Sequence, residues 1–257
     1  MGDNEPIRQC KIISVIMELF YNENLLAHDE SLTFSPEESR HLTKVLRKKV
    51  GELIRVTNGK GLEWNGQIIS TDSRKAAAKK TQASLHQNKI LPLHIAIAPT
   101  KSNDRLEWFL EKATEIGITE ITPIMCDHSE RKSIKPERMK KILVGALKQS
   151  AQYFLPKLNP MISFEALMKL DHPQKKLMAH CQNGNKAPLH QMGDLNDEIL
   201  IMIGPEGDFS EREIKTAQNH SFEAITLSSQ RLRTETAAIV ACSQVATLRE
   251  ISKTESL

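Results

Sequence analysis

From residue 93 onward, the chain alternates short apolar segments with amphipathic ones, and this pattern constrains the fold more than any other feature. Periodicity predicts strands at 93–99, 120–125, 175–181, 198–203 and 223–227, and helices at 102–117, 135–154, 210–220 and 234–251. Strands that alternate with helices in this way form a mostly parallel sheet with helices on both faces. The sequence therefore predicts an α/β fold class for this region.

Residues 17–72 follow a different pattern that is typical of β-structure. Residues 52–71 contain two runs of alternating apolar residues on either side of Asn58-Gly59, a dipeptide that favours a β-hairpin. The segment MELFY at 17–21 predicts a further short strand. We therefore expect a small β-barrel in front of the α/β region.

One short helix is predicted within this barrel, over residues 35–52. Ser35 is a suitable N-cap, Pro36 fits the first turn, and Gly51 is suited to end the helix. The apolar face of this helix is predicted to consist of Leu42, Val45 and Leu46.

Residues 73–89 are polar and basic and contain few large apolar side chains. We predict an exposed turn or linker at 73–80 and the last strand of the barrel at 81–86. Met17 is as good a start for the folded chain as Met1. The expected organisation is an N-terminal extension at 1–16, a β-barrel domain at 17–88 and an α/β domain at 89–257.

Charge and cysteine usage exclude several classes of protein. The formal net charge is only +3, so any binding of nucleic acid must come from local basic patches. The four cysteines are widely spaced and form no CxxC pair, which argues against a metal site and is typical of reduced thiols in a cytoplasmic protein. No apolar run approaches the ~20 residues that span a membrane.

The most informative segment is ILIMIGPEGDFSEREI at 199–214, which predicts a strand, a tight loop and a helix. Gly204 and Gly207 allow the backbone to approach a ligand closely. Glu206 and Asp208 would repel phosphate, and the loop lacks the glycine-lysine pattern of a phosphate-binding loop. The loop suits a ligand with hydroxyls or positive charge, although an ordinary strand-to-helix turn explains it equally well.

A second polar loop, at 228–236, carries Arg231 and Arg233 between a predicted strand and the last helix. Loops at the carboxyl ends of parallel strands form the ligand crevice of such sheets. The loops at 179–182, 204–208 and 228–236 are therefore expected to lie on one edge.

The two loops together resemble the paired signature of the SPOUT methyltransferases, and most closely that of the RsmE family. The segments that carry the resemblance are IGPEGDFSEREI, LSSQRLRTETAAIVA, HLTKVLRKKVGELIRVTNGKG, KSNDRLEWFLEKATEIGITEITPI and ALKQSAQ. They occur in the family's order, and the resemblance covers about residues 17–250. Asp208 departs from the family, which prefers glycine there, and the arginine that usually precedes the first strand is missing.

The resemblance implies a PUA-like β-barrel that binds RNA, followed by a SPOUT-type α/β domain with a C-terminal trefoil knot. It implies S-adenosylmethionine as methyl donor, bound in the knot, and a homodimer. The implied reaction is methylation of N3 of a uridine in 16S ribosomal RNA of the small ribosomal subunit, with no metal, because the sulfonium activates the methyl group.

The resemblance also implies roles for particular residues. Cofactor binding is expected at His180, Ile203, Gly204, Pro205, Glu206, Gly207, Leu227, Leu232, Arg233, Thr234, Glu235, Thr236 and Ala237. Arg105 and Arg233 are expected to stabilise the deprotonated uridine, and Glu115 or Glu206 to accept its proton. A structural role as the partner of an arginine or of a loop amide is an equal alternative for each glutamate. RNA contacts are expected at Arg47, Lys48, Arg74, Lys101, Arg131 and Lys132, although solvated surface charge is the alternative for any one cluster.

Two other functions fit the same motifs. One is a SPOUT methyltransferase that acts on another RNA, and the other is a non-catalytic RNA-binding factor in ribosome assembly. A nicotinamide-dependent dehydrogenase is disfavoured, because the chain lacks the glycine fingerprint of that class and its later acidic residue.

Overall fold

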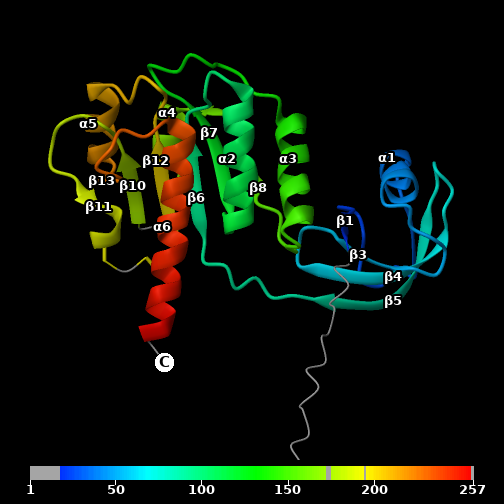
Figure 1. Ribbon diagram of the computed structural model, residues 1–257. Coiled ribbons are helices and arrows are strands. Elements are labelled where there is room, and N and C mark those ends of the chain that lie inside the picture. The colour runs from blue at the N-terminus through cyan, green and yellow to red at the C-terminus, as the bar shows by residue number, and fades with distance from the viewer. Residues whose placement is uncertain (1–17, 172–174, 194, 256–257) are drawn as a thin grey trace, which may run out of the picture.

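The computed structural model describes residues 18–171, 175–193 and 195–255. The predicted extension at 1–16 lies outside the described residues. The chain first builds a small sheet and then a larger one, and the change falls between residues 85 and 93 (Figure 1). The predicted α/β class with an N-terminal β-domain is confirmed.

The small sheet has the strand order β1-β3-β4-β5-β2. Its strands are β1 (Leu19–Tyr21), β2 (Ser31–Thr33), β3 (Leu53–Thr57), β4 (Leu62–Ser70) and β5 (Ala77–Leu85). Strands β3 and β4 form the predicted antiparallel hairpin, in which Arg55 pairs with Asn65. Trp64 is completely buried at the centre of the core that this sheet encloses.

The helix predicted at 35–52 is shorter than expected. Ser35 caps α1 (Pro36–Arg40) as predicted, and the chain continues as a π-helical turn, η1 (His41–Val45). Arg47 then adopts a left-handed conformation with φ 53°, which ends the helical run before Gly51. Leu42 is buried but Val45 is 68% exposed, so the predicted apolar face is wrong at Val45.

The linker predicted at 73–80 is also partly wrong, because β5 begins at Ala77 and pairs with both β4 and β2. Ala76 and Ala78 are buried in the same core as Trp64. A large indole leaves room only for small neighbours, and alanine side chains are too small to give a strong apolar signal in the sequence.

The large sheet has the order β11-β13-β10-β12-β6-β7-β8, and its paired strands are parallel. A further short strand, β9 (Ile162–Ser163), pairs with β7. The other strands are β6 (Leu93–Ile97), β7 (Glu120–Met125), β8 (Lys157–Leu158), β10 (Lys175–Ala179), β11 (Ala187–Pro188), β12 (Ile199–Ile203) and β13 (Glu223–Thr226). The predicted strands are thus present, and β8, β9 and β11 are additions.

Helices cover both faces of this sheet. They are α2 (Asn103–Ile116), α3 (Pro136–Gln149), α4 (Phe164–Met168), α5 (Glu211–Asn219) and α6 (Thr234–Glu255), with a short 3-10 turn, η2 (Leu189–Gln191). Gly117, the last residue of the predicted helix at 102–117, ends α2 in the left-handed conformation. No helix in the described ranges is long and apolar enough to cross a membrane.

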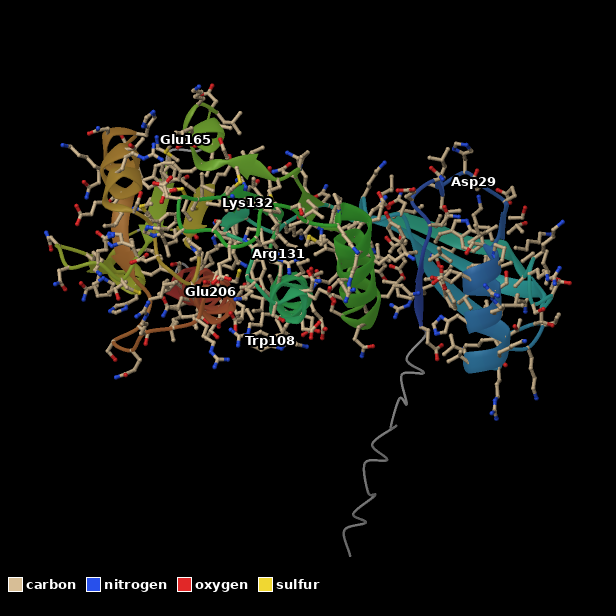
Figure 2. All side chains as sticks on the ribbon, turned by 90° about the horizontal axis from the view of Figure 1, so that it is seen from above. Asp29, Trp108, Arg131, Lys132, Glu165 and Glu206 are labelled. Carbon is tan, nitrogen blue, oxygen red and sulfur yellow. The ribbon has the colours of Figure 1, made fainter. Side chains whose placement is uncertain are left out.

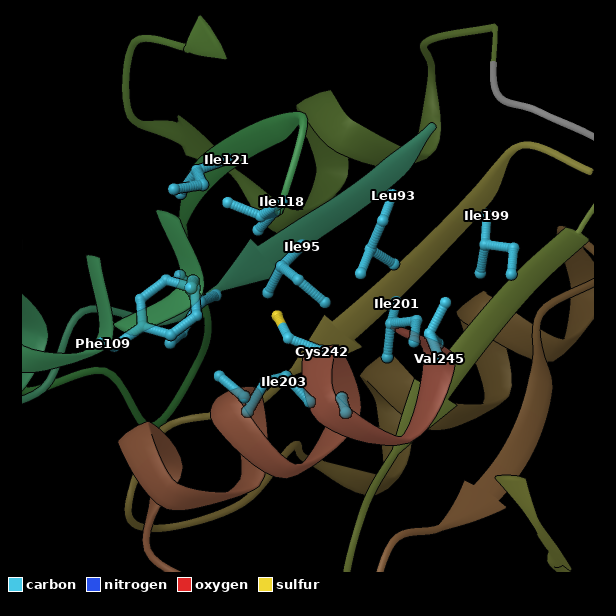
Figure 3. Close-up of a cluster of buried hydrophobic side chains, with 14 of the residues drawn as sticks. Leu93, Ile95, Phe109, Ile118, Ile121, Ile199, Ile201, Ile203, Cys242 and Val245 are labelled. Carbon is cyan, nitrogen blue, oxygen red and sulfur yellow. The ribbon is translucent and has the colours of Figure 1, made fainter. Parts of the chain in front are cut away.

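The central strand β12 is buried along its whole length. Ile199, Ile201 and Ile203 face a core shared with α2, α3 and α6 (Figure 3). Leu200 and Met202 face a second core shared with α4 and α5. A strand that is buried on both faces reads as a continuous apolar run, which explains why the ILIMI segment predicted it well.

Helix α3 stops at Gln149, although the prediction extended it to residue 154. Ala151 has φ 52° and turns the chain toward the small sheet. There the Tyr153 carbonyl accepts the N–H of Gly61 at 2.8 Å, and Phe154 forms a β-bridge with Lys60. Contacts with the other domain therefore replaced the last turn of the predicted helix.

Strand β10 lies between β12 and β13, so the chain passes over it on the way from one to the other. Helix α6 then returns to pack on β6 and β12 (Figure 1). This path brings the last helix back to the middle of the sheet. The trefoil knot itself stays a prediction.

Arg249 of α6 is the main polar link between this helix and the start of the large sheet. Its side chain is 7% exposed and donates hydrogen bonds to the carbonyls of Leu91, Pro92, Leu195 and Asp197, at 2.6 to 2.9 Å. Arg249 thereby satisfies backbone acceptors in two segments that lead into β6 and β12.

We expect Arg249→Ala to lower the free energy of unfolding by about 2–4 kcal/mol, because buried carbonyls lose their donors. Urea unfolding followed by circular dichroism measures this change. Lys253→Ala on the same helix is the control, since its exposed ion pair with Glu250 contributes little. Equal stability of the Arg249 variant and the control would contradict the assignment.

Candidate functional site

A cavity of about 450 Å³ opens where β10, β12 and β13 end and α6 begins. This is the edge where parallel α/β sheets hold ligands. The lining comprises Arg105, Ala179, His180, Cys181, Ile203, Gly204, Pro205, Glu206, Asp208, Ile225, Thr226, Leu227, Ser228, Gln230, Arg231, Leu232, Arg233, Thr234 and Ala237. The three loops that were expected to share one edge therefore meet in one cavity.

The structure brings most of the expected cofactor-binding residues to this cavity. Those that line it are His180, Ile203, Gly204, Pro205, Glu206, Leu227, Leu232, Arg233, Thr234 and Ala237. Gly207, Glu235 and Thr236 are adjacent in sequence but are not among the lining residues. Sequence reasoning omitted Cys181, Ser228, Gln230 and Arg231, although all four lie in or beside the loops that it placed on this edge.

The expected catalytic residues divide between two places. Arg105 on α2 lines the cavity together with Arg233. Glu115 lies about three turns further along α2 than Arg105 and pairs with Lys112 at 3.0 Å, outside the cavity lining. The structure therefore does not bring Glu115 to the site, because the helix axis carries it away from the strand ends.

Gly204 is required by its surroundings. A Cβ atom at this position would lie 2.9 Å from the ring of Phe209, which is buried. The Gly204 carbonyl accepts a hydrogen bond from the hydroxyl of Thr234 at 3.1 Å. This bond ties the end of β12 to the first residue of α6, and the two signature motifs are thereby joined directly.

Asp208 holds the other end of the same loop. It has φ 64°, a conformation that a non-glycine residue adopts at a cost and that Asp tolerates better than most. Its Oδ2 accepts the N–H of Cys181 at 2.8 Å, and its Oδ1 accepts the N–H of Phe209 at 2.9 Å. The departure from the family's glycine therefore supplies a side chain that connects the loop to the end of β10.

The adjacent residues Cys126, Asp127 and His128 do not converge on one point. Burial raises the pKa of the Cys126 thiol, which keeps it protonated and inert. Asp127 binds the guanidinium of Arg212 at 2.7 Å, and this contact lowers the pKa of Asp127. The Nδ1 atom of His128 lies 3.0 Å from the Asp208 carbonyl, so this segment braces the loop.

The residues expected to contact RNA differ in how far their side chains are engaged within the protein. The guanidinium of Arg131 donates to the carbonyls of Thr100 and Lys101 at 2.9 and 2.6 Å, so it is used within the protein. Lys48 is engaged by Glu18 at 2.8 Å. The residues that present exposed cationic side chains are Arg47, Arg74, Lys101 and Lys132. Figure 2 shows all side chains of the molecule seen from above relative to Figure 1, with Arg131, Lys132 and Glu206 labelled.

His180 lines the cavity and Glu235 follows the lining residue Thr234, and both carry buried side-chain atoms that have no hydrogen-bond partner within the described residues. Both ring nitrogens of His180 are buried without a hydrogen bond, and burial lowers the pKa of His180, so its ring is neutral at pH 7. Glu235 is 5% exposed, and its Oε2 has no partner, while its Oε1 lies 3.8 Å from Nε of Arg105. Unpaired buried polar atoms are costly and are typical of binding sites.

The lining fits S-adenosylmethionine. Leu227 and Leu232 offer apolar surface for a purine ring, and the adjacent backbone offers hydrogen-bonding groups for adenine and ribose. Glu206 and Asp208 place negative charge on one loop, which favours a cationic ligand. Among the described residues, no group of three His, Cys, Asp or Glu side chains is placed to hold a metal ion.

Two family models match the chain. A model described as an RNA methyltransferase domain matches residues 86–246, and a model described as an RNA methyltransferase PUA domain matches residues 34–81. Ribosomal RNA small subunit methyltransferase E of Buchnera aphidicola is 30% identical over 224 residues, which are 84% of this chain and 87% of that protein. The Bacillus subtilis protein of the same name is 26% identical over 239 residues, 87% and 93% of the two chains.

Solved structures give the same result. A probable rRNA methyltransferase from Porphyromonas gingivalis superposes with a TM-score of 0.85 and 32% identity, over 92% of this chain and 100% of that chain. Ribosomal RNA small subunit methyltransferase E from Neisseria gonorrhoeae, bound to S-adenosylmethionine, has a TM-score of 0.82 and 28% identity, over 90% and 98%. The similarity therefore extends over both domains.

Two substitutions of Asp208 separate the contribution of its hydrogen bonds to stability from the cost of its left-handed backbone. Asp208→Ala is expected to lower the free energy of unfolding by about 1–3 kcal/mol, because it loses the bonds to Cys181 and Phe209 and keeps the left-handed backbone. Asp208→Gly is expected to recover about 1 kcal/mol of this loss, because glycine adopts that conformation freely. Denaturant unfolding measures both variants.

Ser221 provides the matched control, since it also has φ 64° and lies at an exposed position after α5. Ser221→Gly is expected to leave stability unchanged or to raise it slightly. If Asp208→Ala were as stable as the unaltered protein, the carboxylate would have no part in holding the loop.

Proposed function

The chain belongs to the RsmE family of SPOUT RNA methyltransferases, and we propose that it transfers the methyl group of S-adenosylmethionine to N3 of a uridine in 16S ribosomal RNA. The observation that carries this proposal is the cavity at the carboxyl edge of the large sheet, built by the two signature loops of the family. The relative from Neisseria gonorrhoeae, which was solved with S-adenosylmethionine, supports the same donor.

The residues that would hold the donor follow from the lining. The backbone of Gly204, Leu227, Leu232 and Thr234 would bind the adenine and ribose groups, which carry no charge. Glu206 and Asp208 sit in the same cavity, where their carboxylates favour a ligand with positive charge. When bound, the donor supplies a methyl group that its sulfonium activates, so the chain itself need only position and deprotonate the acceptor.

The acceptor nitrogen must lose a proton before it can attack, and the resulting anion needs positive charge nearby. Arg105 and Arg233 both line the cavity and come from different elements, α2 and the loop before α6. The ion pair with Glu235 holds Arg105 toward the cavity. We assign stabilisation of the anion to these two arginines and proton removal to Glu206.

The two domains would divide the work. The small sheet, which the PUA model matches, would bind RNA through exposed cations that include Arg47 and Arg74. The large sheet would carry the chemistry. The names of the relatives support the small ribosomal subunit as partner, and we place the reaction in the cytoplasm. A transfer RNA is the second candidate for the substrate. The PUA-like domain in front of the large sheet argues against it, because that arrangement resembles the RsmE family.

We also propose that the chain forms a homodimer. The support is Trp108 on α2, which is 45% exposed beside the layer that α2 and α6 form. Tryptophan is enriched at protein–protein interfaces.

Small subunits whose 16S RNA lacks the modification, incubated with the protein and radiolabelled S-adenosylmethionine, test the reaction. We expect label in 16S RNA, and nucleoside mass spectrometry is expected to identify 3-methyluridine at one position. Arg233→Ala is expected to retain donor affinity within about twofold by calorimetry and to lower kcat at least about 100-fold. Donor binding without any transfer would instead favour the non-catalytic alternative.

A further inference from the structure

A second cavity, of about 300 Å³, adjoins the donor cavity and has no assigned occupant. Its lining comprises Lys101, Ser102, Arg105, Glu130 and Glu206. Arg105 and Glu206 line both cavities, so the two spaces meet at these side chains. A group held in the smaller cavity would therefore lie next to a ligand in the larger one.

The smaller cavity brings together residues for which the sequence predicted three different roles. Lys101 was expected to contact RNA, Arg105 to stabilise charge and Glu206 to bind the donor or accept a proton. The backbone N–H of Lys101 donates to Oε1 of Glu206 at 3.0 Å, which fixes the two residues relative to each other. Arg131 holds the same turn through the carbonyl of Lys101.

The ammonium group of Lys101 can reach a ligand at little cost. It pairs with Glu130 at 2.9 Å, and this contact raises the pKa of Lys101, so the side chain stays charged. Lys101 is 77% exposed and Glu130 56% exposed. An exposed pair of this kind is worth less than about 1 kcal/mol, so a bound anion can replace Glu130 as the partner.

We propose that the smaller cavity is the subsite for the acceptor base, a pyrimidine with an ionisable imide N–H between two carbonyl groups. This inference rests on the proposed function and deepens it. Loss of the imide proton spreads negative charge over N3 and the two flanking oxygens. Lys101 and Arg105 supply two cations for that charge, and the cavity has room for one base that has left its helix.

The same cations explain a preference for uridine over cytidine. Cytidine presents an amino group where uridine has a carbonyl, and an amino group cannot accept a hydrogen bond from Lys101 or Arg105. The N3 atom of cytidine also carries no proton to remove. The subsite therefore selects the base by the charge and hydrogen bonds of its Watson–Crick edge.

The reaction at this subsite balances as follows. Glu206 takes the N3 proton on Oε2, the N3–C bond forms, and the C–S bond of the donor breaks with its electron pair passing to sulfur. Lys101 joins Arg105 and Arg233 in neutralising the charge on the base until the new bond has formed. The proton then leaves Glu206 to solvent, and the carboxylate is restored.

Lys101→Gln tests the subsite, with Lys112→Gln on α2 as the matched control, since Lys112 is also paired with glutamates but lies outside both cavities. We expect Lys101→Gln to lower kcat about 10- to 100-fold while donor affinity changes less than about twofold. The loss is expected to shrink as pH rises, because a more alkaline medium assists deprotonation of the base. Lys101→Arg is expected to restore most of the activity.

A second readout does not depend on methyl transfer. A small-subunit RNA fragment with 4-thiouridine at the modified position is expected to cross-link on irradiation within residues 100–106, and mass spectrometry locates the site. Cross-links confined to another segment, or a Lys101→Gln variant with unchanged kcat and pH profile, would overturn the subsite. A wild-type protein that cross-links here but transfers no methyl group would instead contradict the proposed function alone.

Discussion

The geometry of the site depends on hydrogen bonds that hold the short loop from Gly204 to Phe209 at the carboxyl edge of the large sheet. Thr234 binds its first carbonyl, Asp208 connects it to Cys181, and Glu206 accepts the N–H of Lys101. These partners come from three different segments at the sheet edge, which are the start of α6 and the loops that follow β10 and β6. Because so many elements fix one loop, the cavity is shaped before any ligand arrives, and binding need not pay for its ordering.

The hydrophobic and turn patterns of the sequence predicted those parts of the fold that are determined by residues close together in the chain. The apolar run of β12 fills both cores, Gly117 ends α2, and the Asn58-Gly59 signal marks a hairpin. The same holds for the edge of the sheet, because parallel strands bring their carboxyl ends together whatever the sequence between them. The position of the donor cavity could therefore be predicted from the two loops, and most of the residues expected to bind the cofactor line it.

Features that depend on distant partners were not predictable from pattern. The carbonyls that bind Arg249 come from segments more than 50 residues away, and nothing local distinguishes this arginine from a surface one. Arg131 was assigned to RNA because charge suggests exposure, yet its guanidinium is bound to backbone carbonyls. Glu115 was placed near the site because its motif matched, although the axis of α2 carries it away from the strand ends.

The central claim is that the cavity between the 204–208 and 228–236 loops holds the methyl donor. A crystal structure of the protein with S-adenosylmethionine tests it most directly. The account predicts adenine beside Leu227 and Leu232, with the methyl group directed toward Arg105 and Glu206, where the two cavities meet. Density for the donor at any other place, or a methyl group directed away from Arg105, would contradict it.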